Sequence, residues 1–160
     1  MTKTIKLELE TAKSMYKTAS PEFKILLEEN FGKKVLANKV SERVSDFDDI
    51  LSELDKTMED VIPWKGKSLT KNQISLNAAS QIQAITEVYN QGEELDWTNT
   101  SQPKYYIWWE KKAHGGWVLC GVNGSHYRAL LGSGMYFVRR EDAQDAANKF
   151  KDIFVAYLPK

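Results

Sequence analysis

Apolar residues recur every three or four positions in two stretches of the first half of the chain. One stretch begins at Ser20-Pro21, a capping residue followed by proline in the first turn, and it ends at Gly32. The other opens with Thr70 and Gln73, whose three-residue spacing is that of a capping box. Both patterns predict amphipathic helices with defined ends.

After residue 103 the pattern changes to aromatic and β-branched runs separated by turn residues. Asn123-Gly124 is the strongest hairpin signal, because both residues accept the positive φ of a type I′ turn. Gly115-Gly116 and Gly132-Ser133-Gly134 mark two further turns. These signals predict antiparallel strands over residues 105–112, 117–122, 125–131 and 135–139.

The last stretch, from Glu141 to Tyr157, returns to helical spacing with one continuous apolar face. We therefore expect a single α+β domain over residues 1–160. Its helical part covers about residues 1–95, and Asp46 is placed to cap a short helix within it. A three- or four-stranded antiparallel meander and a C-terminal amphipathic helix cover about residues 103–160.

Two-residue turns at Asn123-Gly124 and Gly115-Gly116 would fix which side chains share a side of the sheet, since side chains alternate along a strand. A slip of one residue at the second turn would invert part of the assignment. The first side is expected to face the core and holds Tyr105, Ile107, Trp109, Val118, Cys120, Tyr127 and Ala129. The second side holds Tyr106, Trp108, Glu110, Lys112, Trp117, Leu119, His126 and Arg128.

The second side carries the candidate binding residues. Aromatic rings interleaved with cationic groups are the residue types that stack on a base, a nucleotide or a flat side chain. Whether this side is open, or is covered by the helix over residues 70–91, stays undecided at this point. The candidates are Tyr106, Trp108, Trp117, His126, Arg128 and Lys112.

Charge weakens the general case for nucleic-acid binding. Lysine and arginine together number 22, and so do aspartate and glutamate, whereas phosphate-binding proteins usually carry a basic excess. The chain shows no signal peptide and no apolar run of membrane-spanning length, so a cytoplasmic protein without membrane contact is expected. Its lone cysteine, Cys120, suits a reducing compartment.

No motif supports catalysis, a metal site or a cofactor. His114-Gly115-Gly116 resembles oxyanion-hole glycines, but no Gly-x-Ser-x-Gly elbow accompanies it. Two histidines and one cysteine lack the spacing of a zinc site. Gly132-Ser133-Gly134 could hold a phosphate only if Arg139 or Arg140 converged on it. We therefore expect a non-enzymatic protein with neither metal nor cofactor.

Several short segments resemble a family of phage and mobile-element proteins of gut Bacteroidetes that has no assigned activity. They are Pro21-Glu22-Phe23-Lys24, Leu27-Glu28-Glu29, Phe31-Gly32-Lys33, Asp96-Trp97, Lys104-Tyr105-Tyr106 with Trp108, and Gly132-Ser133-Gly134 with Phe137, Glu141, Ala143, Ala146 and Phe150. This chain departs from the family's pattern before Asp96, where it reads Gly92-Glu93-Glu94-Leu95. The resemblance implies a phage or mobile-element protein that works in a bacterial cell or is carried in a virion.

The expected function is binding of a host or phage protein, for example to inhibit a host defence or replication factor. The alternative is a nucleotide or single-stranded nucleic-acid binder that uses the aromatic and basic side of the sheet. A virion structural or cargo protein is the third possibility.

Overall fold

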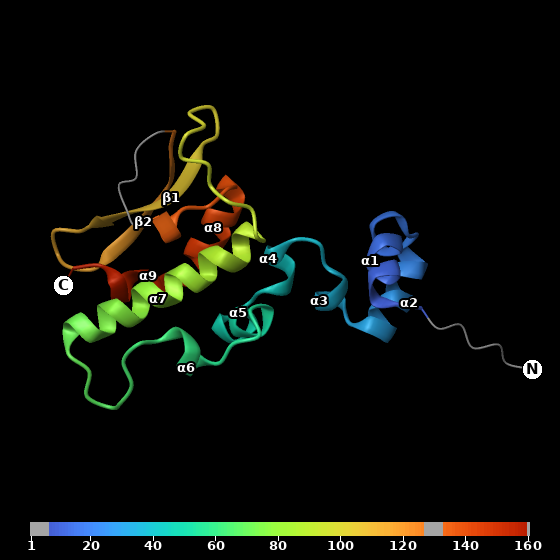
Figure 1. Cartoon of the computed structure of the whole chain (residues 1–160), viewed down its shortest axis with the longest axis horizontal. Coiled ribbons are helices and arrows are strands. Elements are labelled where there is room, and N and C mark those ends of the chain that lie inside the picture. Colours follow the sequence, from blue (N-terminus) through green and yellow to red (C-terminus); the bar gives the residue numbers. More distant parts are fainter. Residues whose placement is uncertain (1–6, 127–132, 160) are drawn as a thin grey trace, which may run out of the picture. The chain divides into compact units, whose positions relative to one another are not determined.

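A computed structural model describes residues 7–126 and 133–159. The chain forms two compact units, Met1–Val44 and Ser45–Lys160, and each is described by itself (Figure 1). The expectation of one domain over residues 1–160 stays a prediction.

The first unit contains four helices among its described residues: α1 (Leu9–Thr18), α2 (Pro21–Phe31), α3 (Lys33–Leu36) and α4 (Val40–Arg43). The predicted caps of α2 are confirmed. Ser20 Oγ accepts a hydrogen bond from the Phe23 amide at 3.4 Å, and Gly32 follows the helix at a φ of 86°. A small core of Ala12, Leu27 and Leu36 holds the helices of this unit together.

The second unit begins with α5 (Phe47–Glu53), α6 (Met58–Val61) and α7 (Lys71–Asn90). Asp46 caps α5 by accepting from the Asp49 amide, and Thr70 and Gln73 form the expected capping box on α7. The second half of α7 is largely buried, so this helix forms the central support of the unit.

The sheet has two strands among the described residues, β1 (Lys104–Lys111) and β2 (Trp117–Ser125), paired in antiparallel order. The mixed helix-and-sheet class is therefore confirmed, but three or four strands are more than the structure shows. On the other edge of β1, Tyr105 forms a single antiparallel bridge with Phe137. Its amide donates to the Phe137 carbonyl at 2.9 Å, and the Phe137 amide donates back at 2.7 Å.

The predicted turn at Asn123-Gly124 is wrong. Both residues continue β2 and pair with Tyr106 and Tyr105, so strand pairing overrides the local preference of this dipeptide. Most of the predicted strand 125–131 falls outside the described residues. In place of the predicted strand 135–139, a 3-10 helix spans Ser133–Met135, and only Phe137 pairs with β1.

The register also corrects the assignment of sides. Lys112 donates to the Gly116 carbonyl, so the hairpin loop is 113–115, and Trp117 pairs with Lys111. A bulge near Trp108 then shifts the pairing by one residue. Because the loop has three residues, Trp117 and Leu119 lie on the side of Trp109, not on the side of Trp108. Cys120, expected in the core, is exposed.

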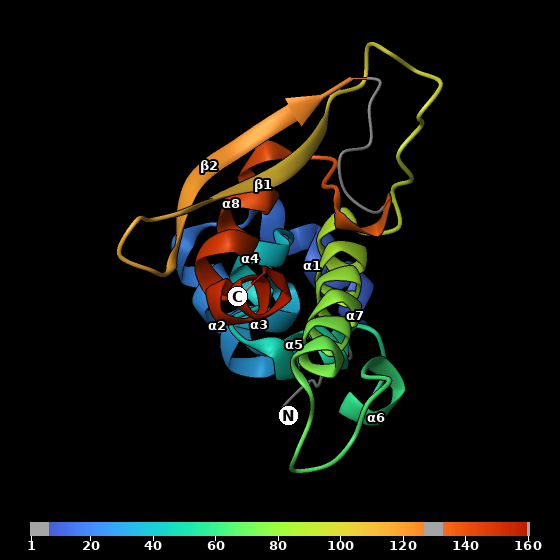
Figure 2. The ribbon, with the colours of Figure 1, turned by 90° about the vertical axis from the view of Figure 1, so that its left-hand side faces the viewer.

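The predicted C-terminal helix is divided into α8 (Arg140–Lys149) and α9 (Lys151–Tyr157). The break lies at Phe150, whose ψ of 26° interrupts the helix although the apolar spacing continues through it. Its ring packs edge-on against Tyr89 of α7, with centroids 6.4 Å apart. As a result α8 lies against both strands, while α9 packs against α7 (Figure 2).

Asn90, the last residue of α7, holds the segment that pairs with β1. Its Nδ2 donates to the Tyr136 carbonyl and its Oδ1 accepts from the Val138 amide, each at 2.9 Å. These bonds place Phe137, which lies between the two partners, at the edge of β1.

Candidate functional site

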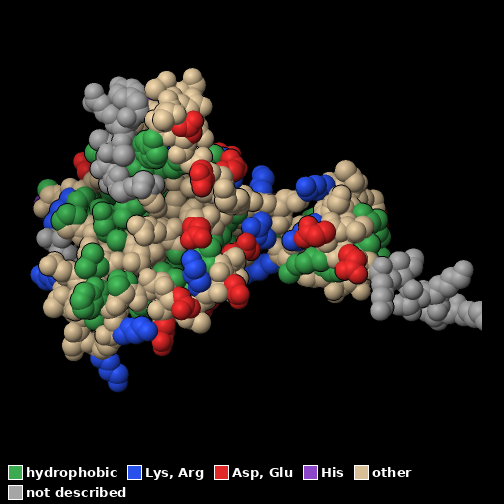
Figure 3. All heavy atoms as spheres, viewed as in Figure 1, with side chains coloured by type: hydrophobic (Ala, Val, Ile, Leu, Met, Phe, Trp, Pro, Cys, Tyr) green, Lys and Arg blue, Asp and Glu red, His purple; other side chains and the backbone are tan. Residues whose placement is uncertain are grey.

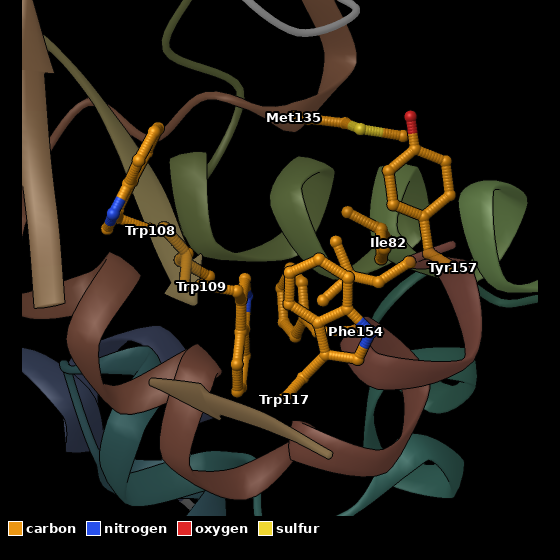
Figure 4. A pocket seen from close by; sticks show the side chains of 9 residues that line it. Ile82, Trp108, Trp109, Trp117, Met135, Phe154 and Tyr157 are labelled. Carbon is orange, nitrogen blue, oxygen red and sulfur yellow. The ribbon is translucent and has the colours of Figure 1, made fainter. Parts of the chain in front are cut away.

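A cavity of about 230 Å³ opens in the second unit between β1, α9, α7 and the 3-10 helix. Hydrophobic side chains also reach the surface over α9 and the adjoining half of α7 (Figure 3). None of the residues that line the cavity is charged. They are Ile82, Ile107, Trp108, Trp109, Trp117, Met135, Phe154, Tyr157 and Leu158 (Figure 4).

Stacked aromatic rings form one wall of the cavity. The rings of Trp109 and Phe154 lie 28° from parallel, with centroids 6.2 Å apart. Trp117 is held beside them by a 3.0 Å hydrogen bond from its Nε1 to the Pro159 carbonyl. Because strand and helix both contribute rings, this wall is part of the packing of the unit.

One polar atom of this wall has no partner. The Nε1 group of Trp109 is buried and donates to no acceptor among the described residues. A buried donor without an acceptor is uncommon in native structures, because its lost hydration is not compensated. This wall of the cavity therefore contains one hydrogen-bond donor for which the described residues provide no acceptor.

Trp108 lies at the rim of the cavity and is 50 % exposed. It points to the opposite side of β1 from Trp109 (Figure 4). Ile107, two residues before Trp109, lies on the side of Trp109 because side chains alternate along a strand. A cavity that touches three consecutive residues of a strand must therefore lie at the edge of that strand, where both sides can be reached. This is the edge of β1 that faces away from β2, on which Phe137 bonds to Tyr105.

The other end of the second side is covered. Tyr106 is buried, and its ring meets Tyr136 edge-on with centroids 5.7 Å apart. Trp97 packs on Tyr136 in turn, at 5.0 Å, and Lys104 Nζ lies 5.7 Å from the Trp97 ring. The second side is thus closed by Trp97 and Tyr136 at one end and open at Trp108, whereas α7 packs mainly on α9.

The five predicted candidates that the structure describes do not form one surface. Trp108 and Trp117 line the same cavity. Tyr106 contacts Trp108 edge-on, with ring centroids 6.5 Å apart. Lys112 follows the end of β1, whereas His126 lies beyond the far end of β2, where its Nδ1 is 3.0 Å from the Thr100 carbonyl. Arg128 lies outside the described residues.

Two of the charged groups near the hairpin, Lys112 and Glu110, are paired with each other. Lys112 Nζ bonds to Glu110 Oε2 at 2.9 Å, which lowers the pKa of the Glu110 carboxyl and raises that of the Lys112 ammonium group. Cys120 Sγ lies 3.5 Å from the same carboxylate oxygen. Desolvation and this carboxylate raise the pKa of the Cys120 thiol, so thiolate chemistry is disfavoured there.

Other candidate chemistries find little support in the described residues. Arg139 bonds to Asp142 at 2.7 Å and also to Glu93, so its guanidinium group is already engaged by carboxylates, and Gly132 of the predicted phosphate loop lies outside the described residues. Across residues 7–126 and 133–159, no group of three His, Cys, Asp or Glu side chains could hold a metal ion. In the same part of the chain, no helix has the length and apolar character needed to cross a membrane.

Two hollows lie among the described residues of the first unit. One, of about 450 Å³, is mainly apolar and is lined by residues of α1 and α2, including Met15 and Leu26. The other, of about 500 Å³, is lined by Tyr16, Asn38 and Glu42 and by four lysines, which are Lys17, Lys24, Lys33 and Lys39. Neither hollow combines exposed aromatic rings with an open strand edge.

Sequence reasoning missed most of the cavity wall. The spacing of Trp109, Phe154 and Tyr157 predicts core positions. No pattern in the sequence marks Met135 or Ile82 as binding residues. The available signal was the concentration of tryptophan, since four of the five lie between residues 97 and 117. Three of those four line the cavity.

No family model matches the chain, and neither a curated protein nor a solved structure with significant similarity to it was found.

Proposed function

We propose that this protein is a non-enzymatic binding protein that holds an apolar side chain of a partner protein in the cavity beside β1. The observation that supports this most is the half-exposed Trp108 at the rim of an uncharged cavity walled by Trp109 and Trp117. Tryptophan is among the residues that most often carry the binding energy of protein interfaces. Large apolar groups gathered at a surface commonly mark such a site.

A protein partner fits this cavity better than a nucleic acid. Binding of a single strand combines stacking platforms with cationic groups that follow its backbone. Here Lys112 is paired with Glu110, and His126 lies at the other end of the sheet, so Lys111, whose Nζ lies 5.8 Å from the centroid of the Trp117 ring, is a single cation beside the rings. The rings are thus not accompanied by a row of cations, and an apolar side chain matches the lining.

The resemblance to phage and mobile-element proteins supports a host or phage protein as the partner. A host defence or replication factor that is occluded by binding is one such partner, in the cytoplasm of the bacterial cell. A virion structural or cargo protein is the alternative setting for the same kind of contact.

The test compares Trp108→Ala with Trp64→Ala. Trp64 is also exposed, at 43 %, but it does not line the cavity, so the pair is matched in residue type and exposure. A partner captured from a bacterial lysate is purified and titrated against the three proteins. We expect Trp108→Ala to weaken binding by roughly 30-fold, which is about 2 kcal/mol, and Trp64→Ala to have no effect.

Equal affinity of the two variants would count against the cavity as the binding site. The salt dependence separates the classes of partner. Contact centred on tryptophan should respond little to added salt, whereas affinity that falls steeply with salt, together with capture of nucleic acid, would favour the nucleic-acid alternative.

A further inference from the structure

The backbone of β1 shows what kind of segment could occupy the cavity. Both the amide and the carbonyl of Tyr105 bond to Phe137, so these groups point away from β2. The amide of Lys112, an odd number of residues later, bonds to Gly116 on the β2 side. Backbone groups in an antiparallel pair alternate in direction along the strand. The amides and carbonyls of Ile107 and Trp109 therefore point to the same outer edge as those of Tyr105.

Among the described residues, Phe137 is the only backbone partner on that outer edge, and it pairs with Tyr105. No residue of the described chain forms a backbone hydrogen bond with Ile107 or Trp109 on this edge. Continuation of the Phe137 segment in antiparallel order would bring Met135 opposite Ile107. Instead, the 3-10 helix Ser133–Met135 takes the chain away, and the Met135 side chain lines the cavity. At Ile107 and Trp109 this edge therefore presents backbone donors and acceptors that no described residue pairs with, beside an apolar hollow, the arrangement that accepts an added strand. Ile107 itself is only 6 % exposed, so a segment that pairs with it has to enter the cavity.

Charge gives a second feature of the occupant. Lys111 is exposed at the far end of this edge, and its Nζ lies 5.8 Å from the centroid of the Trp117 ring. Among the described residues no carboxylate pairs with Lys111, whereas the neighbouring Lys112 is paired with Glu110. Lys111 and Trp109 are two residues apart and so lie on the same side of β1.

We infer that an extended segment of a partner protein adds to the outer edge of β1 and continues the pairing begun by Phe137. It places an apolar side chain in the cavity beside Trp109 and an acidic side chain, two residues away, at Lys111. This inference rests on the proposed function, because it names the class of segment that the same cavity takes. Backbone bonds to Ile107 and Trp109 supply the alignment, and the cavity and Lys111 supply the selectivity.

The probe is a library of random linear peptides of about twelve residues, twice the usual length of a strand. Peptides selected on the full chain are titrated against the wild type and against Trp108→Ala and Trp64→Ala. The expected peptides share an apolar residue and an acidic residue two positions apart. Trp108→Ala should weaken their binding, and Trp64→Ala should leave it unchanged.

Amide hydrogen exchange, followed by NMR, then tests strand addition directly. On addition of a selected peptide, exchange at Ile107 and Trp109 should slow by about tenfold or more, because their amides gain acceptors. The amides of Tyr106 and Glu110 are the internal control, since alternation directs them to β2. Methylation of alternate peptide amides should abolish binding, while methylation of the intervening amides should be tolerated.

Each contrary result has its own meaning. Peptides that depend on Trp108 but leave exchange at Ile107 and Trp109 unchanged would overturn strand addition and leave the proposed function standing. A library that yields no peptide dependent on Trp108 would overturn both. Slower exchange at the same two amides when only the protein's own concentration is raised would show that a second copy is the occupant, and the assignment to a partner segment would be wrong.

Discussion

Trp109 of β1 stacks on Phe154 of α9, with ring centroids 6.2 Å apart and planes 28° from parallel. This contact connects the sheet to the helix that packs on α7. Its neighbour Trp108 has no comparable support from the core and is half exposed. Two adjacent residues of the same type therefore have different roles in the same strand.

The first prediction concerns these two tryptophans. Trp109→Ala removes a stacked ring from the packing and should lower the free energy of unfolding by about 3 kcal/mol or more. Trp108→Ala should change it by less than about 1 kcal/mol, because the lost surface is largely solvated. Urea denaturation of both variants measures the difference. Equal losses would show that Trp108 belongs to the core and would remove the basis of the binding proposal.

The second prediction concerns the hydrogen bonds of Asn90 to Tyr136 and Val138. Asn90→Ala removes both of these hydrogen bonds from a largely buried site and should cost about 2–3 kcal/mol. Asn148→Ala, at an exposed helical position, is the control and should be nearly neutral. A thermal melt of Asn90→Ala that matches the wild type would show that Phe137 is placed by other contacts.

The third prediction uses the buried Tyr89, whose hydroxyl donates to Asp145 at 2.6 Å. Burial, and then the bond to Asp145, raise the pKa of Tyr89 above its ordinary value. The unfolded chain ionises this tyrosine near pH 10 while the folded chain keeps it neutral, so the stability it contributes is present below about pH 10 and is lost above it.

Tyr89→Phe should therefore cost about 1–2 kcal/mol at pH 7, through loss of a hydrogen bond to a carboxylate. The gap between the variant and the wild type should narrow as the pH rises above about 10. Denaturant unfolding at neutral and alkaline pH measures this gap. A gap that stays constant over that range would contradict the raised pKa.

The fourth prediction concerns two glycines of β2. Gly121 lies next to the bulge at a φ of 147°, which L side chains rarely adopt, although an added Cβ would meet no atom within 4 Å. Gly121→Ala should therefore cost about 1 kcal/mol or more through backbone strain alone. Gly124→Ala meets only ordinary contacts with the Tyr105 ring at 3.6 Å and should be nearly neutral. If the two variants have the same melting temperature, the bulge accommodates alanine at residue 121 without backbone strain.

Local signals were enough to place the helix starts. Ser20, Asp46 and Thr70 each cap the helix expected from the sequence, because a cap depends on residues only three positions apart. Features set by distant contacts could not be read in this way. Asn123-Gly124 forms no turn because β1 pairs through it, and the break at Phe150 accompanies packing against Tyr89.

The candidate site was predictable only in part. The residue type and the sequence position of Trp108 and Trp117 indicated the part of the sheet where the cavity lies. Their arrangement depends on a three-residue hairpin loop, which moves Trp117 to the side of Trp109, and on a bulge, which shifts the pairing between Trp109 and Trp108. No local pattern marks a bulge at Cys120-Gly121, and the contribution of α9 to the cavity needs the division of the last helix.

The labelling rate of Lys104 gives an independent measure of how often the sheet opens. It is fully buried, and its Nζ donates to the Asn99 carbonyl at 2.7 Å and to the His126 carbonyl at 3.4 Å. A reagent that acylates amines reaches surface lysines at once, but it reaches this amine only when the loop before β1 and the end of β2 separate. The rate at which Lys104 is labelled therefore reports how often that end of the hairpin opens, in a protein whose other lysines serve as the reference.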